Sequence, residues 1–261
     1  MPFLDTGHTT LYYDISSTNV TSSATTPSLL LVHGFMGTPQ SDFKAQLPLL
    51  TPYYTVIMPH LHGSGLSSHR TTYTVNYYRE DVADLIALLD TLHLEKVYVL
   101  GFSDGATVSL LLAALHPSRV AALAILGAQA TVNERDVKAI RSWLLEKPLS
   151  EEWQQELAHL HGDPYWQSLL PLYVQGQEKL VEAGGILLSD EELAEIRCPT
   201  LLMHGVRDRI VSVEYAHTLH DHISHSHLLL FDAGHAAHIR CEAKYTATIL
   251  RFFQNPHTFS L

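Results

Sequence analysis

The sequence predicts an α/β fold, in which a mostly parallel sheet is flanked by helices and carries a helical insertion. Continuous apolar runs, such as Ser28–His33 and the run that starts at Val97, are typical of strands buried on both faces. Between such runs, Tyr73–Leu92 has apolar residues at a period near 3.6, which predicts a helix that packs on the sheet. Strands and helices that alternate in this order imply parallel strands joined by right-handed crossovers.

The chain length and composition fit a globular protein with one such domain. The sequence has 261 residues, of which 46% are hydrophobic and 16% charged, and this is enough to bury a large core. Its net charge of -11 and its lack of a basic cluster argue against nucleic acid as a partner. No apolar run approaches about 18 residues, so we expect no membrane span.

The cysteine and histidine patterns favour a reduced compartment without a metal site. Cys198 and Cys241 have no ligand-like spacing, and the N-terminal residues show no secretory signal, so we expect a cytoplasmic protein. A local group of histidines is interpreted as solvated, because no Glu, Asp and His set recurs at helical ligand spacing. We therefore expect neither a metal ion nor an organic cofactor. The histidine group comprises His217, His220, His222, His225 and His227.

The first hundred residues predict the elements that lead to the centre of the sheet. Weak alternation over Phe3–Ile15 predicts antiparallel strands, and the Ser/Thr-rich residues 19–27 predict a polar loop. Ser28–His33 and Tyr54–Met58 predict buried strands, with a short helix over Phe43–Leu50 between them. The predicted helix at 73–92 then leads directly to the strand that starts at Val97.

The run from Val97 ends in Gly101-Phe-Ser-Asp-Gly105, and helix-like residues follow at once. A strand that turns into a helix within one residue brings its backbone so close that side chains at Gly101 and Gly105 would clash. Such a turn exposes the Ser103 hydroxyl at the end of the strand. It also places the Asp104 N–H at a helix N-terminus, where negative charge is favoured. The pentapeptide alone is equally compatible with a glycine-lined turn and a capping serine.

The pattern changes after the predicted strand Val120–Leu126. Residues 128–197 are helix-like and rich in aromatic side chains, so we interpret them as a helical cap, with residues 1–127 and 198–261 as the core domain. These aromatic side chains either line a substrate pocket or form the core of the cap itself, and both alternatives stay open. The sheet resumes with strands at Pro199–His204 and His225–Phe231, and Glu242–Phe253 predicts a closing helix.

Two later strand ends carry the side chains that a nucleophilic serine needs. A serine hydroxyl requires a base to take its proton, and the base requires a third group to hold its tautomer. Asp208 follows the strand at 199–204, and His235 follows the strand at 225–231. His238 is an alternative base, but it lies one helical turn further on, so its position favours His235. The sequence therefore predicts Ser103 as nucleophile, His235 as base and Asp208 as its orienting acid.

A second glycine-rich segment, His33-Gly-Phe-Met-Gly37, follows the first predicted buried strand. Acyl transfer requires a second N–H donor for the oxyanion, and in this architecture the donor comes from the loop after that early strand. Gly34 and Gly37 let the backbone fold back over the serine, so Phe35 N–H is the candidate donor beside Asp104 N–H. A plain glycine turn is the alternative reading of this segment.

These motifs together resemble the α/β-hydrolase superfamily over essentially the whole chain. The resemblance implies the α/β-hydrolase fold, a serine acyl-enzyme mechanism and no cofactor. Within the superfamily, Gly101-Phe-Ser-Asp-Gly105, the segment 34–47 and Gly234-His-Ala-Ala-His-Ile-Arg240 resemble the subgroup of valacyclovir hydrolase, the biphenyl-hydrolase-like hydrolases of α-amino-acid esters. Ala106 and His60 depart from the pattern of the subgroup, which bears on the shape of the pocket and not on the catalytic residues.

The resemblance also implies a role for Asp104 in binding the substrate, because the subgroup uses the acid after its nucleophile to hold an α-ammonium. A carboxylate beside a developing oxyanion raises the barrier for a neutral substrate, and an ammonium ester supplies the cation that offsets this effect. The alternative is that Asp104 points away and forms hydrogen bonds to the cap or to nearby backbone.

We therefore expect a serine esterase whose partner is a small-molecule ester, of small or α-amino-acid type. Hydrolysis of a carbon–carbon bond or of an enol-lactone by the same residues is the first alternative, and arginine in the pocket wall would favour it. A hydrolase-like binding or signalling protein with slow turnover is the second. Peptidase action on free N-termini is not separated from ester cleavage by the sequence, and the oligomeric state is not readable from it.

Overall fold

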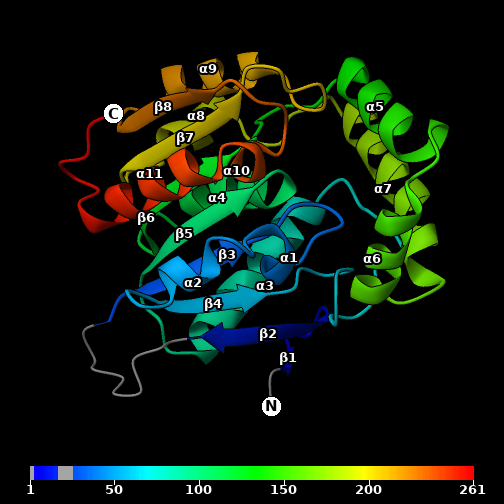
Figure 1. The fold of residues 1–261 in the computed structure, drawn as a ribbon, viewed down its shortest axis with the longest axis horizontal. Helices are drawn as coiled ribbons and strands as arrows, with labels where there is room; N and C mark the ends of the chain where they lie inside the picture. Colours follow the sequence, from blue (N-terminus) through cyan, green and yellow to red (C-terminus); the bar gives the residue numbers. More distant parts are fainter. Residues whose placement is uncertain (1–2, 17–25) are drawn as a thin grey trace.

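A single mixed sheet organises the computed structural model, which describes residues 3–16 and 26–261 (Figure 1). Within these residues, eight strands form the sheet in the order β1-β2-β4-β3-β5-β6-β7-β8. The strands β1 (Phe3–Asp5) and β2 (Thr10–Ser16) are antiparallel to each other, and β2 is antiparallel to β4 (Thr55–Pro59). The other neighbours are parallel, as the sequence predicts. Most of the predicted polar loop at 19–27 lies outside the described residues.

The central strands are apolar on both faces because each face packs on a different core. In β3 (Ser28–Val32), Leu30 and Val32 belong to one hydrophobic cluster, and Leu29 and Leu31 to the other. This alternation follows from the period of two residues in a strand. The remaining parallel strands, which are equally apolar in sequence, are β5 (Val97–Phe102), β6 (Val120–Leu126), β7 (Thr200–Gly205) and β8 (Ser226–Phe231).

Helices cover both faces of the sheet. The helices α3 (Tyr77–Thr91), α4 (Asp104–Leu115) and α9 (Val213–His222) contribute to the first cluster, and α11 (Glu242–Gln254) contributes to the second. Figure 1 shows α11 and the short α10 (Ala237–Arg240) in front of the sheet, with α3 and α4 behind it. Because these helices lie on the faces of the sheet, they do not cover the carboxyl ends of the parallel strands.

Two predicted helix boundaries differ from the structure. The helix α3 begins at Tyr77 and not at Tyr73. The predicted helix at 43–50 is replaced by α1 (Pro39–Asp42) and α2 (Leu47–Leu50). A continuous helix would place Pro48 in its interior, where proline has no N–H to donate, whereas in α2 it stands in the first turn, where that donor is not needed.

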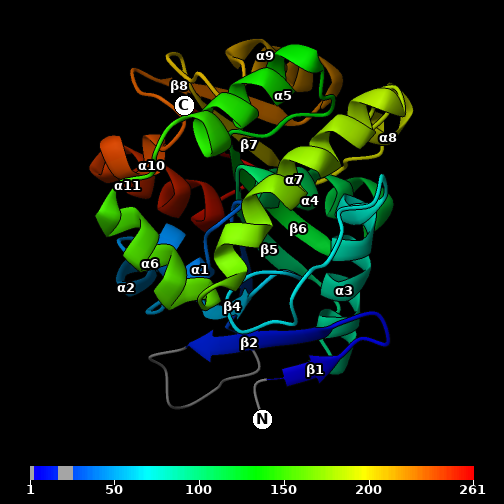
Figure 2. The same cartoon turned by 90° about the vertical axis from the view of Figure 1, so that its right-hand side faces the viewer.

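The segment between β6 and β7 is helical and lies over one end of the sheet (Figure 2). It comprises α5 (Glu134–Arg141), a π-helical turn at Ser142–Glu146, α6 (Glu151–His161), α7 (Tyr165–Glu182) and α8 (Asp190–Ala194). We call α5, α6, α7 and the π-helical turn the insertion helices, whereas α8 packs beside α4 and α9. The predicted division into core and cap at residues 127 and 198 stays a prediction.

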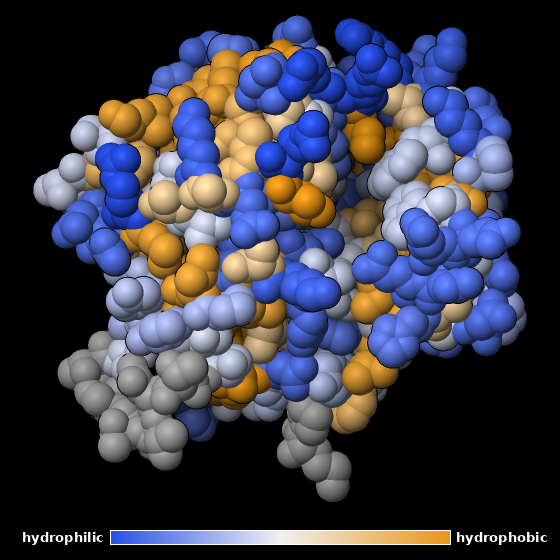
Figure 3. Space-filling model, viewed as in Figure 1, coloured by the Kyte–Doolittle hydropathy of each residue, from blue (hydrophilic) through white to orange (hydrophobic). Residues whose placement is uncertain are grey.

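The surface view shows where the insertion helices meet the rest of the protein. On the face drawn in Figure 3, a hollow separates the body that contains the sheet from the helical layer on the right, and apolar side chains are visible within it. Across residues 3–16 and 26–261, none of the helices is long and apolar enough to cross a membrane. The cytoplasmic location stays a prediction.

Candidate active site

Ser103 lies at the sharp turn between β5 and α4, with φ 54° and ψ -123°. This backbone conformation is rare for residues other than glycine and costs energy, so the surrounding structure must hold it. The close approach that forces it is visible at Gly105, where an added Cβ would collide with the carbonyl oxygens of His33 and Val32. The predicted strand, turn and helix are thus present, and the Ser103 side chain faces the hollow under the insertion helices.

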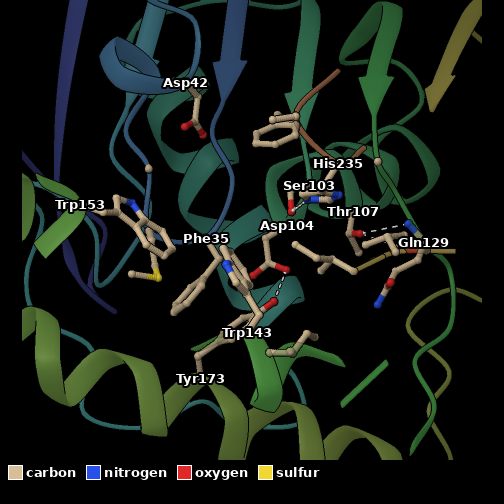
Figure 4. Close-up of a pocket in the computed structure, with 18 residues that line it drawn as sticks. Phe35, Asp42, Ser103, Asp104, Thr107, Gln129, Trp143, Trp153, Tyr173 and His235 are labelled. Atoms are coloured by element: carbon tan, nitrogen blue, oxygen red, sulfur yellow. Dashed lines mark hydrogen bonds between the residues drawn. The ribbon is translucent and has the colours of Figure 1, made fainter. Parts of the chain in front are cut away.

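The structure brings the predicted partners of Ser103 together, and Figure 4 shows the contact of Ser103 with His235. His235 Nε2 lies 2.8 Å from Ser103 Oγ, and His235 Nδ1 lies 2.6 Å from Asp208 Oδ2. Asp208 stands after β7 and His235 after β8, so neighbouring strand ends supply the two side chains. With Nδ1–H donated to the carboxylate, Nε2 is free to accept the serine proton.

Asp208 is a buried carboxylate that its surroundings keep ionised. Its side chain is 1% exposed, and its Oδ1 accepts the N–H groups of Ile210 and Val211 at 2.9 and 3.0 Å. Burial by itself raises the pKa of a carboxyl, but the hydrogen bonds from His204 and His235 and the His235 charge hold the pKa of Asp208 well below its usual range. The ionised form is the one that orients a histidine and stabilises its protonated state.

His238, the alternative base, does not contact Ser103. Its ring is buried at 2% exposure and lies against Phe102, with 4.3 Å between ring centroids. Burial, together with the nearby His235, lowers the pKa of His238 to about 4. His235 is therefore the histidine that reaches Ser103, and His238 packs against Phe102.

The backbone N–H groups of Phe35 and Asp104 border the same cavity as Ser103. Among the described residues neither N–H has a hydrogen-bond partner, and Asp104 is the first residue of α4. N–H donors without a partner suit an oxyanion, and the start of a helix further favours negative charge at the Asp104 N–H. We call residues 33–37 the oxyanion loop; its Gly34 N–H donates to Asp42 Oδ2 at 2.8 Å.

The role of Asp42 in holding this loop is absent from our sequence predictions. Its carboxyl lines the cavity, and an added Cβ at Gly37 would collide with it, so the loop and the acid fit closely. Burial is the main reason that the pKa of Asp42 rises to about 7. The glycines at 34 and 37 could have indicated this role. They predict a tightly folded loop, and the N–H groups of such a loop require a nearby acceptor.

This raised pKa gives a prediction for the Asp42→Asn variant. An unfolded aspartate has a pKa of about 3.9, so between about pH 4 and pH 7 the unfolded chain loses a proton that the folded chain keeps, and the free energy of unfolding falls. Asparagine still accepts the Gly34 N–H but does not titrate. We measure the Tm difference, variant minus native, at pH 5 and at pH 8. We expect this difference to be about 2 °C or more larger at pH 8. An equal difference at both pH values, or the same trend in the exposed control Asp221→Asn, would contradict this prediction.

The Asp104 carboxylate is surrounded by tyrosines. Its Oδ1 accepts the hydroxyls of Tyr78 and Tyr173 at 2.7 Å each, and its Oδ2 accepts the Tyr77 hydroxyl at 3.3 Å. Tyr77 and Tyr78 come from α3, whereas Tyr173 comes from the insertion helix α7. Burial raises the pKa of Asp104, and the tyrosine hydrogen bonds oppose that rise. The hydrogen bond to the insertion, one of the two sequence alternatives, is thus present, while the carboxylate also borders the cavity.

The cavity between the sheet and the insertion helices has a volume of about 260 Å³. Ser103 and His235 lie at its inner end, and Trp143, Trp153 and Tyr173 form much of the outer wall (Figure 4). The two tryptophans stack with 5.6 Å between ring centroids and 20° between ring planes. Not all the aromatic side chains of the insertion line the cavity, because others are buried in the core. The cavity therefore suits a small substrate with an apolar part.

A possible metal-binding group lies away from this cavity. Across the described ranges, His8, His62 and Asp84 place potential ligand atoms within 4.8 Å of one another, and none of these residues lines the cavity. Asp84 Oδ1 already accepts the Thr6 hydroxyl at 2.6 Å. The histidines at 217–227 are not part of this group, and in the described structure some of them bond to nearby surface groups, such as His222 to Asp190.

A buried parallel sheet with a serine at a strand–helix turn, and a histidine and an aspartate at later strand ends, is the arrangement of a hydrolase with a serine nucleophile. The chain belongs to the α/β-hydrolase fold family, whose model matches residues 27–165.

Its similarity to individual proteins extends across both the sheet and the insertion. Serine hydrolase BPHL of Mus musculus is 29% identical over 232 residues, which cover 87% of this chain and 79% of that protein. The 2-hydroxy-6-oxo-2,4-heptadienoate hydrolase of Pseudomonas putida is 27% identical over 230 residues, covering 79% of this chain and 82% of that one. A meta-cleavage product hydrolase of Pseudomonas fluorescens has the same fold, with a TM-score of 0.81 at 19% identity and 97% coverage of both chains. The similarity to serine hydrolase BPHL confirms the resemblance to the biphenyl-hydrolase-like subgroup that the motifs indicate.

Proposed function

We propose that this hydrolase cleaves carboxylic esters through an acyl-enzyme on Ser103. The observation that carries the proposal is the continuous hydrogen-bonded series from Ser103 Oγ through His235 to Asp208, with separations of 2.8 and 2.6 Å, at the inner end of a cavity. A hydroxyl in this arrangement loses its proton to the imidazole as it attacks a carbonyl carbon. Asp208 stabilises the imidazolium that forms.

In the first half of the reaction, Ser103 Oγ bonds to the ester carbon and the carbonyl oxygen becomes an oxyanion. We assign that charge to the N–H groups of Phe35 and Asp104, two residues that line the cavity, because such donors contribute most where water is excluded. His235 then returns its proton to the departing alcohol. In the second half, His235 takes a proton from water, which attacks the acyl carbon and releases the acid and the free serine.

The surroundings of Asp104 favour an acyl group that carries an α-ammonium. The carboxylate lies one residue from the nucleophile, so its charge opposes the oxyanion unless a substrate cation offsets it. The Tyr173 hydroxyl donates to Asp104, and the Phe35 ring stacks on the Tyr173 ring at 3.7 Å between centroids, so aromatic side chains lie beside the carboxylate. A carboxylate beside aromatic rings is a favourable environment for an ammonium group. The motif resemblance to the hydrolases of α-amino-acid esters implies the same substrate class.

Hydrolysis of a carbon–carbon bond is the alternative that the relatives raise, because the Pseudomonas putida protein is named for such a substrate. A substrate of that kind carries a carboxylate, which an arginine in the wall would bind. Among the described residues that line the cavity, none is arginine or lysine, and the acids Asp42 and Asp104 border it. The Asp104 carboxylate, with no cation among the described lining residues, thus favours a cationic substrate over an anionic one.

The discriminating experiment is to measure kcat/KM on a matched pair of esters that differ by an α-ammonium or a hydrogen at the same carbon. We expect the native protein to prefer the amino ester, and Asp104→Asn to reduce that preference about 30-fold or more, because a broken buried charge pair costs at least about 2 kcal/mol. Asp221→Asn, which removes an exposed acid on α9, is the control and should keep the native preference.

Other outcomes of this experiment favour the other hypotheses. Equal turnover of the neutral ester by the native protein would contradict the amino-ester proposal and leave a general esterase or a carbon–carbon hydrolase. Absence of any turnover that depends on Ser103, together with a covalent adduct that persists on Ser103, would favour the binding or signalling protein.

A further inference from the structure

The oxyanion loop is held by a histidine from the insertion. His161 is the last residue of α6 and is 2% exposed. Its Nε2 lies 2.9 Å from the carbonyl oxygen of Met36, and its Nδ1 accepts the N–H of Gly65 at 2.9 Å. Because Nδ1 accepts, the proton is on Nε2, which donates to Met36. One neutral tautomer of His161 thus joins the insertion to the oxyanion loop and to the loop after β4.

The bond to Met36 acts on a backbone conformation that needs support. Met36 has φ 66°, which is uncommon for a residue with a side chain. A hydrogen bond to its carbonyl fixes the plane of the peptide between Met36 and Gly37. On the other side, Asp42 accepts the N–H of Gly34 at 2.8 Å. The candidate oxyanion donor, Phe35 N–H, therefore lies between one residue held by the core and another held by the insertion.

A second contact from the insertion reaches the same loop. The Phe35 ring stacks on Tyr173 of α7, with 12° between the ring planes. Two insertion helices thus contact adjacent residues of the loop. The helix α7 packs on the Phe35 side chain, and α6 forms a hydrogen bond with the Met36 carbonyl. Movement of α6 away from the sheet would remove the bond to the Met36 carbonyl.

We propose that His161 is a positioning residue that couples the seating of the insertion helices to the geometry of the oxyanion loop. The inference rests on the proposed function, since it assigns Phe35 N–H to the oxyanion. Loss of a bond that is only structural would lower the fraction of folded protein and leave kcat per active site unchanged. Loss of a positioning bond lowers kcat, because a donor that is displaced from an oxyanion no longer stabilises the transition state fully, while substrate binding is little affected.

The test uses variants of the full chain, with kcat referred to the concentration of titrated active sites. His161→Leu removes the donor and the acceptor, and we expect kcat to fall about 10- to 100-fold with KM changed less than about threefold. His161→Gln keeps one donor and one acceptor, and should recover most of the lost kcat. His159→Leu, on the exposed side of the same helix, is the matched control and should have native kcat. Native kcat in folded His161→Leu would overturn the inference.

If His161→Leu does not fold, the polar variants carry the test. His161→Asn has the same hydrogen-bonding groups as His161→Gln on a shorter side chain, which does not span from Gly65 to Met36. We expect kcat of His161→Asn to be about tenfold below that of His161→Gln. Equal kcat values for the two variants would contradict a positioning role.

A fluorophosphonate separates failure of this inference from failure of the proposed function. Ser103 Oγ bonds to phosphorus, the P–F bond breaks, fluoride leaves and His235 takes the serine proton, while the phosphoryl oxygen occupies the oxyanion position. Intact mass measures the rate of this labelling without any ester. Native protein that is not labelled at Ser103 contradicts the proposed function. Native labelling with an equal rate in His161→Leu contradicts the inference alone, whereas a rate about tenfold lower or more supports it.

Discussion

Replacing Ser103 with alanine is expected to lower kcat for an ester by about 10⁶-fold, the loss typical of removing a serine nucleophile from such a set of residues. The reason is that the acyl-enzyme no longer forms, and the oxyanion donors alone supply a small residual acceleration. Measurement of kcat on a chromogenic ester, with the stability of each variant recorded beside it, checks the prediction.

The backbone conformation of Ser103 also predicts an effect on stability, which is separate from the loss of activity. Ser103 has φ 54° and ψ -123°, which glycine adopts without strain and alanine does not. We expect Ser103→Gly to be as inactive as Ser103→Ala, yet more stable by about 1 kcal/mol in the free energy of unfolding. Residual activity above about 1% of native in either variant would contradict the role of Ser103. Equal stability of the two variants would contradict the strain at the turn.

Asp208→Asn is expected to lower kcat by about 10⁴-fold with little change in the position of His235. The Oδ1 of residue 208 accepts the N–H groups of Ile210 and Val211, so the asparagine would keep its oxygen there and turn its NH₂ toward His235 Nδ1. His235 would then carry its proton on Nε2, which faces Ser103, and could not accept the serine proton. Steady-state kinetics on a reactive ester measure the effect.

The control for this variant is Asp232→Asn, which removes an acid with an 83% exposed side chain three residues before His235. We expect it to keep native kcat within about twofold, because exposed ion pairs contribute little. A loss smaller than about tenfold in Asp208→Asn would show that another group sets the tautomer of His235. Acid stability provides a second readout. Because the pKa of Asp208 is lowered on folding, its contribution to stability is present above about pH 4 and is lost as the folded carboxyl is protonated at lower pH.

The meeting of Ser103, His235 and Asp208 was predictable because each residue is tied to a local rule. A serine at a strand–helix turn requires glycine at 101 and 105, and the collision calculated for a Cβ at Gly105 shows the physical reason. Asp208 and His235 were placed by counting strands, because parallel strands bring their carboxyl ends to one edge of a sheet. The buried strands were predicted from continuous apolar runs, which a strand buried on both faces requires.

The residues that shape the site around these three were not predictable in the same way. Tyr173 reaches Asp104 across 69 positions of sequence, and His161 reaches Met36 across 125. No period or motif marks such pairs, because they depend on how the insertion helices settle on the sheet. The split of the predicted helix at 43–50 has a local cause at Pro48. Asp42, the last residue of α1, holds the oxyanion loop only through its contact with Gly34.

Local chemistry in the sequence was sufficient to predict a mostly parallel sheet and the meeting of Ser103, His235 and Asp208. The signals were glycine where backbones touch, apolar runs where both faces are buried and polar side chains at strand ends. The direction of the Asp104 carboxylate, the anchors of the oxyanion loop and the wall of the cavity were decided by packing between distant segments. Those contacts are chosen by shape and by the need of each buried polar group for a partner, and neither requirement is written in a short stretch of chain.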